Sequence, residues 1–356
     1  MTTVRWTWLI AGALASTLAA RSAHAQVVSW QAPATYAAGF APAVAMSGFG
    51  LGWMVEEHAA SNCGVFCSAP FWSGAGTWAS GTFGGVSLVD QGGSGLNRLA
   101  GDAGSGSLQL VEVHEPYTWS DFSQPVWYRV GTLDPVTGRV GWGGARSGPA
   151  GTQLGLAIGN SGIGGATAVL VNSIARVDGP LPRPPDGNLY YELGTVNADG
   201  ASITWGPPIA TEGGQSPAVA MLYTGSRFFI AQVHEDFSGN LWLRTGTLTP
   251  GASTIAWTAV APYDRGTQPT IALCSNFGGT PIVVEVHQGG PGTLWYRSGL
   301  VDTVHATIQL GGSAQISTAS GAARPRVACA GRSGALVYGA GTSIAPVAVV
   351  QRFTAQ

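Results

Sequence analysis

Glutamate, histidine, tryptophan and arginine recur along this chain in one fixed order. Glu112 and His114 stand two residues apart in VEVH, and Trp127 and Arg129 stand two residues apart in WYRVG. In an extended strand residues i and i+2 lie on the same face, so each pair shares a face. An aromatic ring, a guanidinium group and a carboxylate at fixed positions could bind the C–H surface and the hydroxyl groups of a sugar.

Two further sets repeat this arrangement. The candidate ligand-binding residues are Glu112, His114, Trp127 and Arg129; Gln232, His234, Trp242 and Arg244; and Glu285, His287, Trp295 and Arg297. The same residues could instead form a polar network between sheets, because buried carboxylates and imidazoles need hydrogen-bond partners. Leu170 and Glu192 replace two partners together, which favours the network. Leu336 beside a retained Arg352 speaks against it.

The sets belong to a repeat that covers nearly the whole chain. Positions equivalent to the histidine recur every 51 to 62 residues, at His58, His114, Asn172, His234, His287 and Tyr338. Each unit holds four short apolar runs separated by Gly, Pro and Asp turns, which is typical of four antiparallel strands. The segment 27–31 matches the strand that the last unit lacks, and we expect it to pair near 349–353.

A sheet that is apolar on both faces must be covered on both, and radial repetition does this with short protected edges. We therefore predict an all-β fold, a six-bladed β-propeller of four-stranded antiparallel blades. Residues 26–356 should form this single domain, closed by pairing of the N- and C-terminal strands.

The composition of the chain excludes some classes of partner. The net charge is −2, charged residues are 10% of the chain, and no basic stripe could follow a phosphate backbone, so nucleic acid is excluded. An apolar stretch after Arg5 ends in the cleavage signature Ala23-His24-Ala25, so residues 1–25 are predicted to be a signal peptide. We expect a secreted protein (periplasmic, cell-surface or extracellular) with no membrane span.

Export makes disulfides possible. Cys63 and Cys67 are expected to form a local bridge, whereas Cys274 and Cys329, near the ends of equivalent strands, could be bridged or could be two buried thiols. No second close Cys or His pair and no D-x-D-x-D-G loop occurs in the sequence, so no metal and no cofactor are predicted.

With these recurring residues the chain resembles the secreted β-propeller lectins, and in architecture it is similar to the six-bladed fucose-binding lectins. This resemblance implies several sites between adjacent blades, built from Arg, Glu and Trp. The expected function is therefore that of an exported, non-enzymatic carbohydrate-binding propeller whose partners are glycans.

Two alternatives stay open. The loop 181–187, LPRPPDG, could form part of a scaffold that binds a surface protein. An exported hydrolase or lyase is the third possibility, although no single constellation differs from the repeat, so no catalytic residue is predicted. Asp199-Gly200 followed by Trp205 resembles the Asp-box turn of sialidases, with a different glycine position and spacing.

Overall fold

The computed structural model describes most of the chain. The described residues are 28–47, 52–60, 69–102, 109–116, 125–161, 166–173, 187–275, 279–316, 318–342 and 345–355. They form strands and turns without a helix, and none of them belongs to a helix long and apolar enough to cross a membrane. The predicted signal peptide, the Cys63–Cys67 bridge and most of the loop 181–187 lie outside these ranges.

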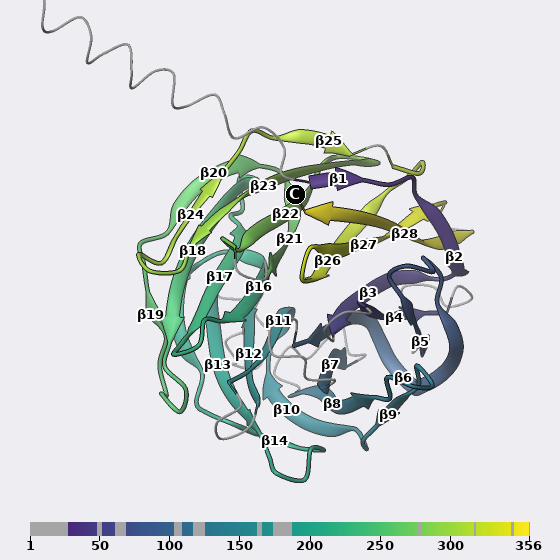
Figure 1. Cartoon of the computed structure of the whole chain (residues 1–356), viewed down its shortest axis with the longest axis horizontal. Coiled ribbons are helices and arrows are strands. Elements are labelled where there is room, and N and C mark those ends of the chain that lie inside the picture. Colours follow the sequence, from purple (N-terminus) through teal and green to yellow (C-terminus); the bar gives the residue numbers. More distant parts are fainter. Residues whose placement is uncertain are drawn as a thin grey trace, which may run out of the picture.

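Six antiparallel blades surround a central axis, as predicted (Figure 1). Blade one holds β3 (Phe40–Ser47), β4 (Trp53–Ala59), β5 (Ala69–Thr77) and the first part of β6 (Gly84–Gly101). Blade two holds the rest of β6, β7 (Gln109–Pro116), β8 (Pro125–Leu133), β9 (Val140–Trp142) and β10 (Arg146–Ala150). Blade three holds β11 (Thr152–Asn160), β12 (Ala166–Ser173), β13 (Asn188–Val196), β14 (Ile203–Trp205) and β15 (Ile209–Gly213).

The remaining blades repeat this order. Blade four holds β16 (Gln215–Tyr223), β17 (Phe228–Glu235), β18 (Asn240–Leu248), β19 (Ala256–Trp257) and β20 (Ala261–Arg265). Blade five holds β21 (Thr267–Cys274), β22 (Ile282–Gly290), β23 (Thr293–Asp302), β24 (Thr307–Leu310) and β25 (Ala314–Ile316). Blade six holds β26 (Ala323–Ala330), β27 (Ser333–Gly341), β28 (Pro346–Ala355), β1 (Val28–Trp30) and β2 (Ala34–Ala38).

The outermost strand is split in most blades. In blades three to five, two short segments pair with different parts of the third strand, so together they count as the fourth strand. Blades one and two differ, because β6 pairs with β5 through its first half and with β7 through its second half. One long strand is thus the outer edge of blade one and the inner strand of blade two.

Closure of the ring by both chain ends is confirmed. Strand β1 pairs antiparallel with β28, where Trp30 lies opposite Phe353, and β2 pairs further along the same strand. The Trp30 ring contacts Phe353 with centroids 4.8 Å apart and Tyr296 of blade five with centroids 5.3 Å apart. The N-terminal segment therefore completes blade six and also packs it on blade five.

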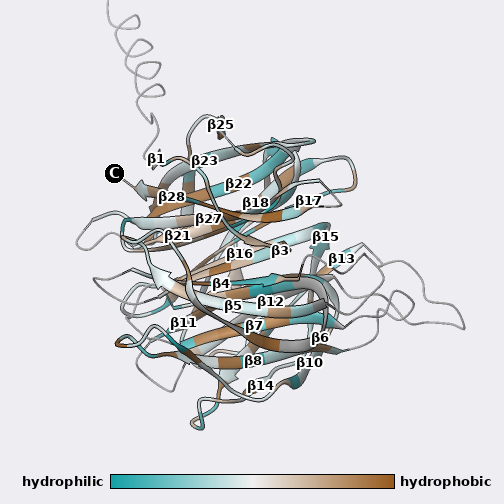
Figure 2. Cartoon of the chain, turned by 90° about the vertical axis from the view of Figure 1, so that its right-hand side faces the viewer, coloured by the Kyte–Doolittle hydropathy of each residue, from teal (hydrophilic) through white to brown (hydrophobic). Residues whose placement is uncertain are grey.

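A tyrosine–tryptophan contact recurs at three blade boundaries. The pairs are Tyr128 with Trp205, Tyr191 with Trp257, and Tyr296 with Trp30, all edge-to-face. The Tyr128 hydroxyl also accepts the Ile203 N–H at 3.0 Å, and the Tyr191 hydroxyl accepts the Ile255 N–H at 3.2 Å. These aromatic pairs fix the spacing of neighbouring sheets. Along the strands, hydrophobic stretches are interrupted by hydrophilic ones (Figure 2).

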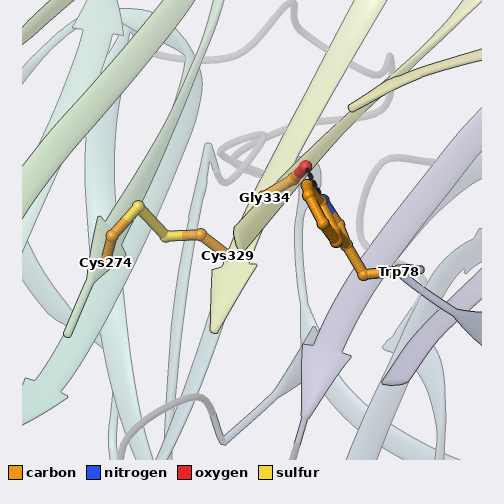
Figure 3. Close-up of a disulfide and its surroundings, with 4 residues drawn as sticks. All are labelled: Trp78, Cys274, Cys329 and Gly334. Atoms are coloured by element: carbon orange, nitrogen blue, oxygen red, sulfur yellow. Dashed lines mark hydrogen bonds between the residues drawn. A yellow bond between two sulfur atoms is a disulfide. The ribbon is translucent and has the colours of Figure 1, made fainter. Parts of the chain in front are cut away.

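Blade six is held from both sides. A disulfide joins Cys274 of β21 to Cys329 of β26, with their Cα atoms 5.3 Å apart (Figure 3). Of the two alternatives left open by the sequence, a disulfide bridge or two buried thiols, the structure has the bridge. Closing a loop of 55 residues should stabilise the fold by about 4 kcal/mol through chain entropy. On the other side, the Trp78 indole N–H of blade one donates to the Gly334 carbonyl at 3.0 Å.

We expect Trp30→Ala to lower the free energy of unfolding by about 3 kcal/mol, because it removes a packed aromatic side chain from the seam of the ring. Denaturant unfolding of the purified protein measures this loss. Val136→Ala is the control, since Val136 is 89% exposed and should change stability little. Equal unfolding midpoints for the two variants would contradict a closing role for Trp30.

Candidate functional site

The structure brings each predicted set of residues together. In blade two, Glu112 lies opposite Arg129 and His114 lies opposite Trp127 across the β7–β8 ladder. The same register joins the sets of blade four and blade five. The four residue types therefore occupy one patch of each blade, as the spacing predicts.

The acidic and imidazole groups of these patches are buried. Hydrogen-bond distances join His58 Nδ1 to Glu56 Oε2 (3.0 Å), His114 Nδ1 to Glu112 Oε1 (2.8 Å), and His287 Nδ1 to Glu285 Oε2 (3.1 Å). Burial raises the pKa of Glu285, and the hydrogen bond from His287 opposes this shift. Trp127 differs from these groups in being 40% exposed.

Two of the three arginines of these patches connect neighbouring blades. Arg244 of blade four donates through Nη1 to Glu212 of β15 in blade three, at 2.5 Å, and through Nε to Gln232. Arg297 of blade five donates through Nε to Asp264 of β20 in blade four, at 2.6 Å. These contacts form a polar network between blades. Ligand binding by the twelve candidate residues stays a prediction.

Blade six agrees better with this network than its sequence suggested. Leu336 lies opposite Gln351, not Arg352, in the β27–β28 ladder. The Gln351 amide N–H donates to the Gln31 carbonyl at 2.9 Å, whereas Arg352 donates to the Trp78 carbonyl of blade one. The interpretation of Arg352 as the retained arginine was therefore wrong by one residue, because the alternation of strand faces places it on the other side.

The recurring histidine also packs against a recurring glycine that precedes the inner strand of the same blade. A Cβ atom added to Gly39, Gly214 or Gly266 would lie 2.6, 2.4 and 2.6 Å from the Cδ2 atom of His58, His234 and His287, respectively. Only glycine leaves room for this approach. The histidine thus fixes the path of the chain just before the inner strand begins.

In five of the six blades, the second residue of the inner strand has a left-handed backbone. The five positions are Ala41 (φ 49°), Gln153 (φ 53°), Ser216 (φ 50°), Gln268 (φ 52°) and Arg324 (φ 54°). Each is followed by a break in ladder register, which is the mark of a β-bulge. We call these five residues the bulge rim. Left-handed backbone is costly for residues other than glycine, so it points to a site that neighbouring groups hold in place.

Hydrogen bonds run along the bulge rim from blade two to blade six. The Gln153 N–H donates to Glu115 Oε1 at 2.6 Å, and the Ser216 N–H donates to Gln153 Oε1 at 2.9 Å. The Gln268 N–H donates to Glu235 Oε2 at 2.7 Å, and the Arg324 N–H donates to Gln268 Oε1 at 3.1 Å. The Ser216 hydroxyl links the two halves by donating to Glu235 Oε1 at 3.2 Å.

This rim borders a cavity of about 240 Å³ at the centre of the ring. All six blades contribute to its lining, for example through Ala43, Leu99, Gly155, Ala218, Ile271 and Val327. Three arginines also line it: Arg98 from blade two, and Arg324 and Arg326 from blade six. None of the described residues in the lining is Asp or Glu, so cations dominate the charge of the cavity.

The arginines influence one another electrostatically. Burial lowers the pKa of Arg98 to about 10; the nearby Arg324 lowers it too, and Glu115 acts in the opposite direction. Burial, Arg98 and Arg324 lower the pKa of Arg326 well below its ordinary value. Because an arginine pKa near 10 is still far above neutrality, Arg98 stays charged there.

Sequence reasoning missed this cavity. Its signal was present, because Arg324-Pro325-Arg326 stands where other units have Ser216-Pro217-Ala218 or Gln268-Pro269-Thr270. Those segments were identified only as inner strands, by what they share. In the described part of the chain, no group of three His, Cys, Asp or Glu residues is placed to hold a metal ion.

Comparison with known proteins gives structural matches alone. No family model matches the chain, and no curated protein does. A protein of unknown function from Dyadobacter fermentans has a TM-score of 0.59 at 11% identity, over 92% of this chain and 99% of its own. Trypanosoma rangeli sialidase with the inhibitor DANA has a TM-score of 0.54 at 14% identity, over 89% of this chain and 55% of its own. A triple arginine-to-alanine mutant of AofleA from Arthrobotrys oligospora has a TM-score of 0.55 at 11% identity, over 88% of this chain and 83% of its own.

These matches support the six-bladed propeller architecture and confirm no specific lectin family. This chain spans about half the length of the sialidase. They also correct the expected function, because the matched structures include sialidases, which are enzymes. The interpretation of the chain as a non-enzymatic lectin was therefore wrong.

The buried histidine of blade four should make stability depend on pH. Burial and then Arg244 lower the pKa of His234 to about 4. Between pH 6.5 and 4 the unfolded chain therefore binds a proton that the folded chain does not, and stability falls on acidification by an amount on the order of 3 kcal/mol. His234→Asn, which carries the residue type of Asn172, should lose less stability over this range.

Denaturant unfolding at several pH values between 8 and 4 measures the difference. His305→Asn is the matched control, because His305 lies on an exposed turn and should leave the wild-type trend in place. Parallel curves for His234→Asn and the wild type would refute the assignment.

Proposed function

We propose that this chain binds a small anionic ligand in its central cavity. The observation that carries the proposal is the convergence of Arg98, Arg324 and Arg326 on a space whose described lining has no carboxylate. Glu115 is the acidic group that interacts with all three arginines. The balance of these four side chains is +3 − 1 = +2, so an anion would neutralise charge that the protein leaves uncompensated.

The free-energy argument points the same way. Half-buried guanidinium groups lose hydration, and like charges close together repel, so the empty arrangement is unfavourable unless an anion binds. Charge-assisted hydrogen bonds from arginine to a carboxylate contribute about 1.5–3 kcal/mol each. A cavity of about 240 Å³ admits a small group and excludes the bulk of a polymer.

A second step concerns the reaction. Matched structures include Trypanosoma rangeli sialidase with sialic acid, a carboxylate sugar, and with the inhibitor DANA. On this support we propose that the ligand is the acidic sugar of a glycoside and that the chain hydrolyses it. We assign no catalytic residue, because the described lining offers the hydroxyl groups of Ser216 and Thr270 but no carboxylic acid.

Export to an oxidising compartment remains part of the proposal. The Cys274–Cys329 disulfide supports it, because structural disulfides persist outside the reducing cytosol. An extracellular location would also bring the cavity into contact with glycan substrates.

Removing one cavity cation tests the binding site. Arg326→Met keeps much of the side-chain volume and removes the charge, so it should weaken binding of an acidic sugar about 10- to 100-fold. Isothermal titration with N-acetylneuraminate, glucuronate and galactose measures this, and galactose should not bind. Arg139→Met, on an exposed turn, is the control. Unchanged affinity of Arg326→Met, or equal binding of galactose, would place the site elsewhere.

Hydrolysis has its own test. The wild type should release 4-methylumbelliferone from its N-acetylneuraminic acid or glucuronic acid glycoside and not from the galactoside. Arg326→Met should lower kcat/KM for the acidic substrate, because the Arg326 guanidinium group stabilises the bound anion. Binding of acidic sugars without release from either acidic glycoside would reject the hydrolytic step and leave the binding site standing.

A further inference from the structure

The side-chain amides of the bulge rim have a defined orientation. The side chain of Gln153 accepts a hydrogen bond from the Ser216 backbone N–H. The side chain of Gln268 accepts one from the Arg324 backbone N–H. A backbone N–H can only donate, so the amide atom facing it must be the oxygen. The Nε2 group of each glutamine is the other end of that amide and carries two N–H donors. Both glutamines line the cavity.

Carboxylates of the neighbouring blades hold these glutamines in place. Glu115 of blade two accepts the Gln153 N–H, and Glu235 of blade four accepts the Gln268 N–H. Burial raises the pKa of both carboxyl groups, and the same N–H bonds counteract that shift. Each glutamine is therefore fixed at its backbone by one neighbouring blade and at its side-chain oxygen by the next.

The two kinds of donor occupy several points around the cavity. Arg98 comes from blade two and Arg324 and Arg326 from blade six, so the cations flank blade one. Gln153 comes from blade three and its amide reaches Ser216 of blade four, whereas Gln268 comes from blade five and its amide reaches Arg324 of blade six. Blades one and four lie on opposite sides of the six-bladed ring (Figure 1). The Gln153 amide therefore lies opposite the cations, and the Gln268 amide lies beside Arg324.

We propose that Gln153 and Gln268 are specificity-determining residues of the central cavity. The three arginines bind the anionic group of a ligand, and the two amides bind further acceptor oxygens of the same ligand. The selected chemical class is a polyhydroxylated carboxylate, as in an acidic sugar, in preference to a simple anion. This inference rests on the proposed anion site and adds the source of its selectivity.

The predicted selectivity can be measured without any variant. N-acetylneuraminate or glucuronate should bind the wild type at least about 5-fold more tightly than acetate, because two additional hydrogen bonds contribute about 0.5–1.5 kcal/mol each. Isothermal titration under one buffer condition gives the ratio of the association constants. Acetate binding as tightly as both sugars would overturn the inference.

Two isosteric variants then locate the selectivity. Gln268→Glu and Gln153→Glu keep an oxygen facing the backbone N–H and replace the Nε2 donors by a second oxygen. The added charge weakens all anions, whereas loss of the donor weakens the sugar alone. Each variant should therefore lower the ratio of sugar to acetate association constants about 3- to 10-fold. Gln309→Glu adds the same charge on the exposed β24 and should keep the wild-type ratio.

The outcomes separate the two proposals. An unchanged ratio in both cavity variants, with Arg326→Met still weakening every anion, would overturn the role of the glutamines and leave the anion site intact. Failure of the wild type to bind any of the three anions would remove the anion site and this inference together. Circular dichroism and thermal unfolding identify a variant that does not fold, and the second glutamine then supplies the test.

Discussion

The position of the cavity charges depends on closure of the ring by the two ends of the chain. Arg324 and Arg326 belong to blade six, whose outer strands β1 and β2 come from the opposite end of the sequence. Without those strands β28 would expose an unpaired edge, and blade six would lose its packing of Trp30 on blade five. The hydrogen bonds between β1 and β28 thus decide where two of the three cavity arginines stand relative to Arg98.

In this geometry the recurring residues and the residues of the bulge rim have different roles. The recurring Glu and His residues are buried between blades, and the recurring His packs on the glycine that leads into the bulge rim. The left-handed residues of the rim cost about 1 kcal/mol or more each, and carboxylates and amides of adjacent blades offset that cost. Residues that first suggested a binding site therefore also position the chain around the central cavity, where we propose the ligand binds.

Much of the fold could be predicted from the sequence, because every blade faces the same packing problem and solves it with similar residues. Period counting was sufficient for the number of blades and for the shared blade at the two termini. The continuous strand β6 was not predictable in this way, since no repeated residue marks where blade one ends. The cysteine pair was undecided because strand position alone does not give the 5.3 Å between Cα atoms.

The candidate site could not be predicted from the sequence, for the opposite reason. A repeat search finds what the blades share, whereas a cavity on the axis of a ring needs differences among blades to bind an asymmetric ligand. At the position of Arg326, the inner strand of blade two carries Arg98. The other four inner strands carry Ala43, Gly155, Ala218 and Thr270 there, and their small size leaves the space that the arginines border. The repeated residues build the scaffold, and the proposed binding residues are those that differ between blades. In a repeat protein of this kind, charged residues at inner-strand positions that are small in other blades are therefore the first to examine.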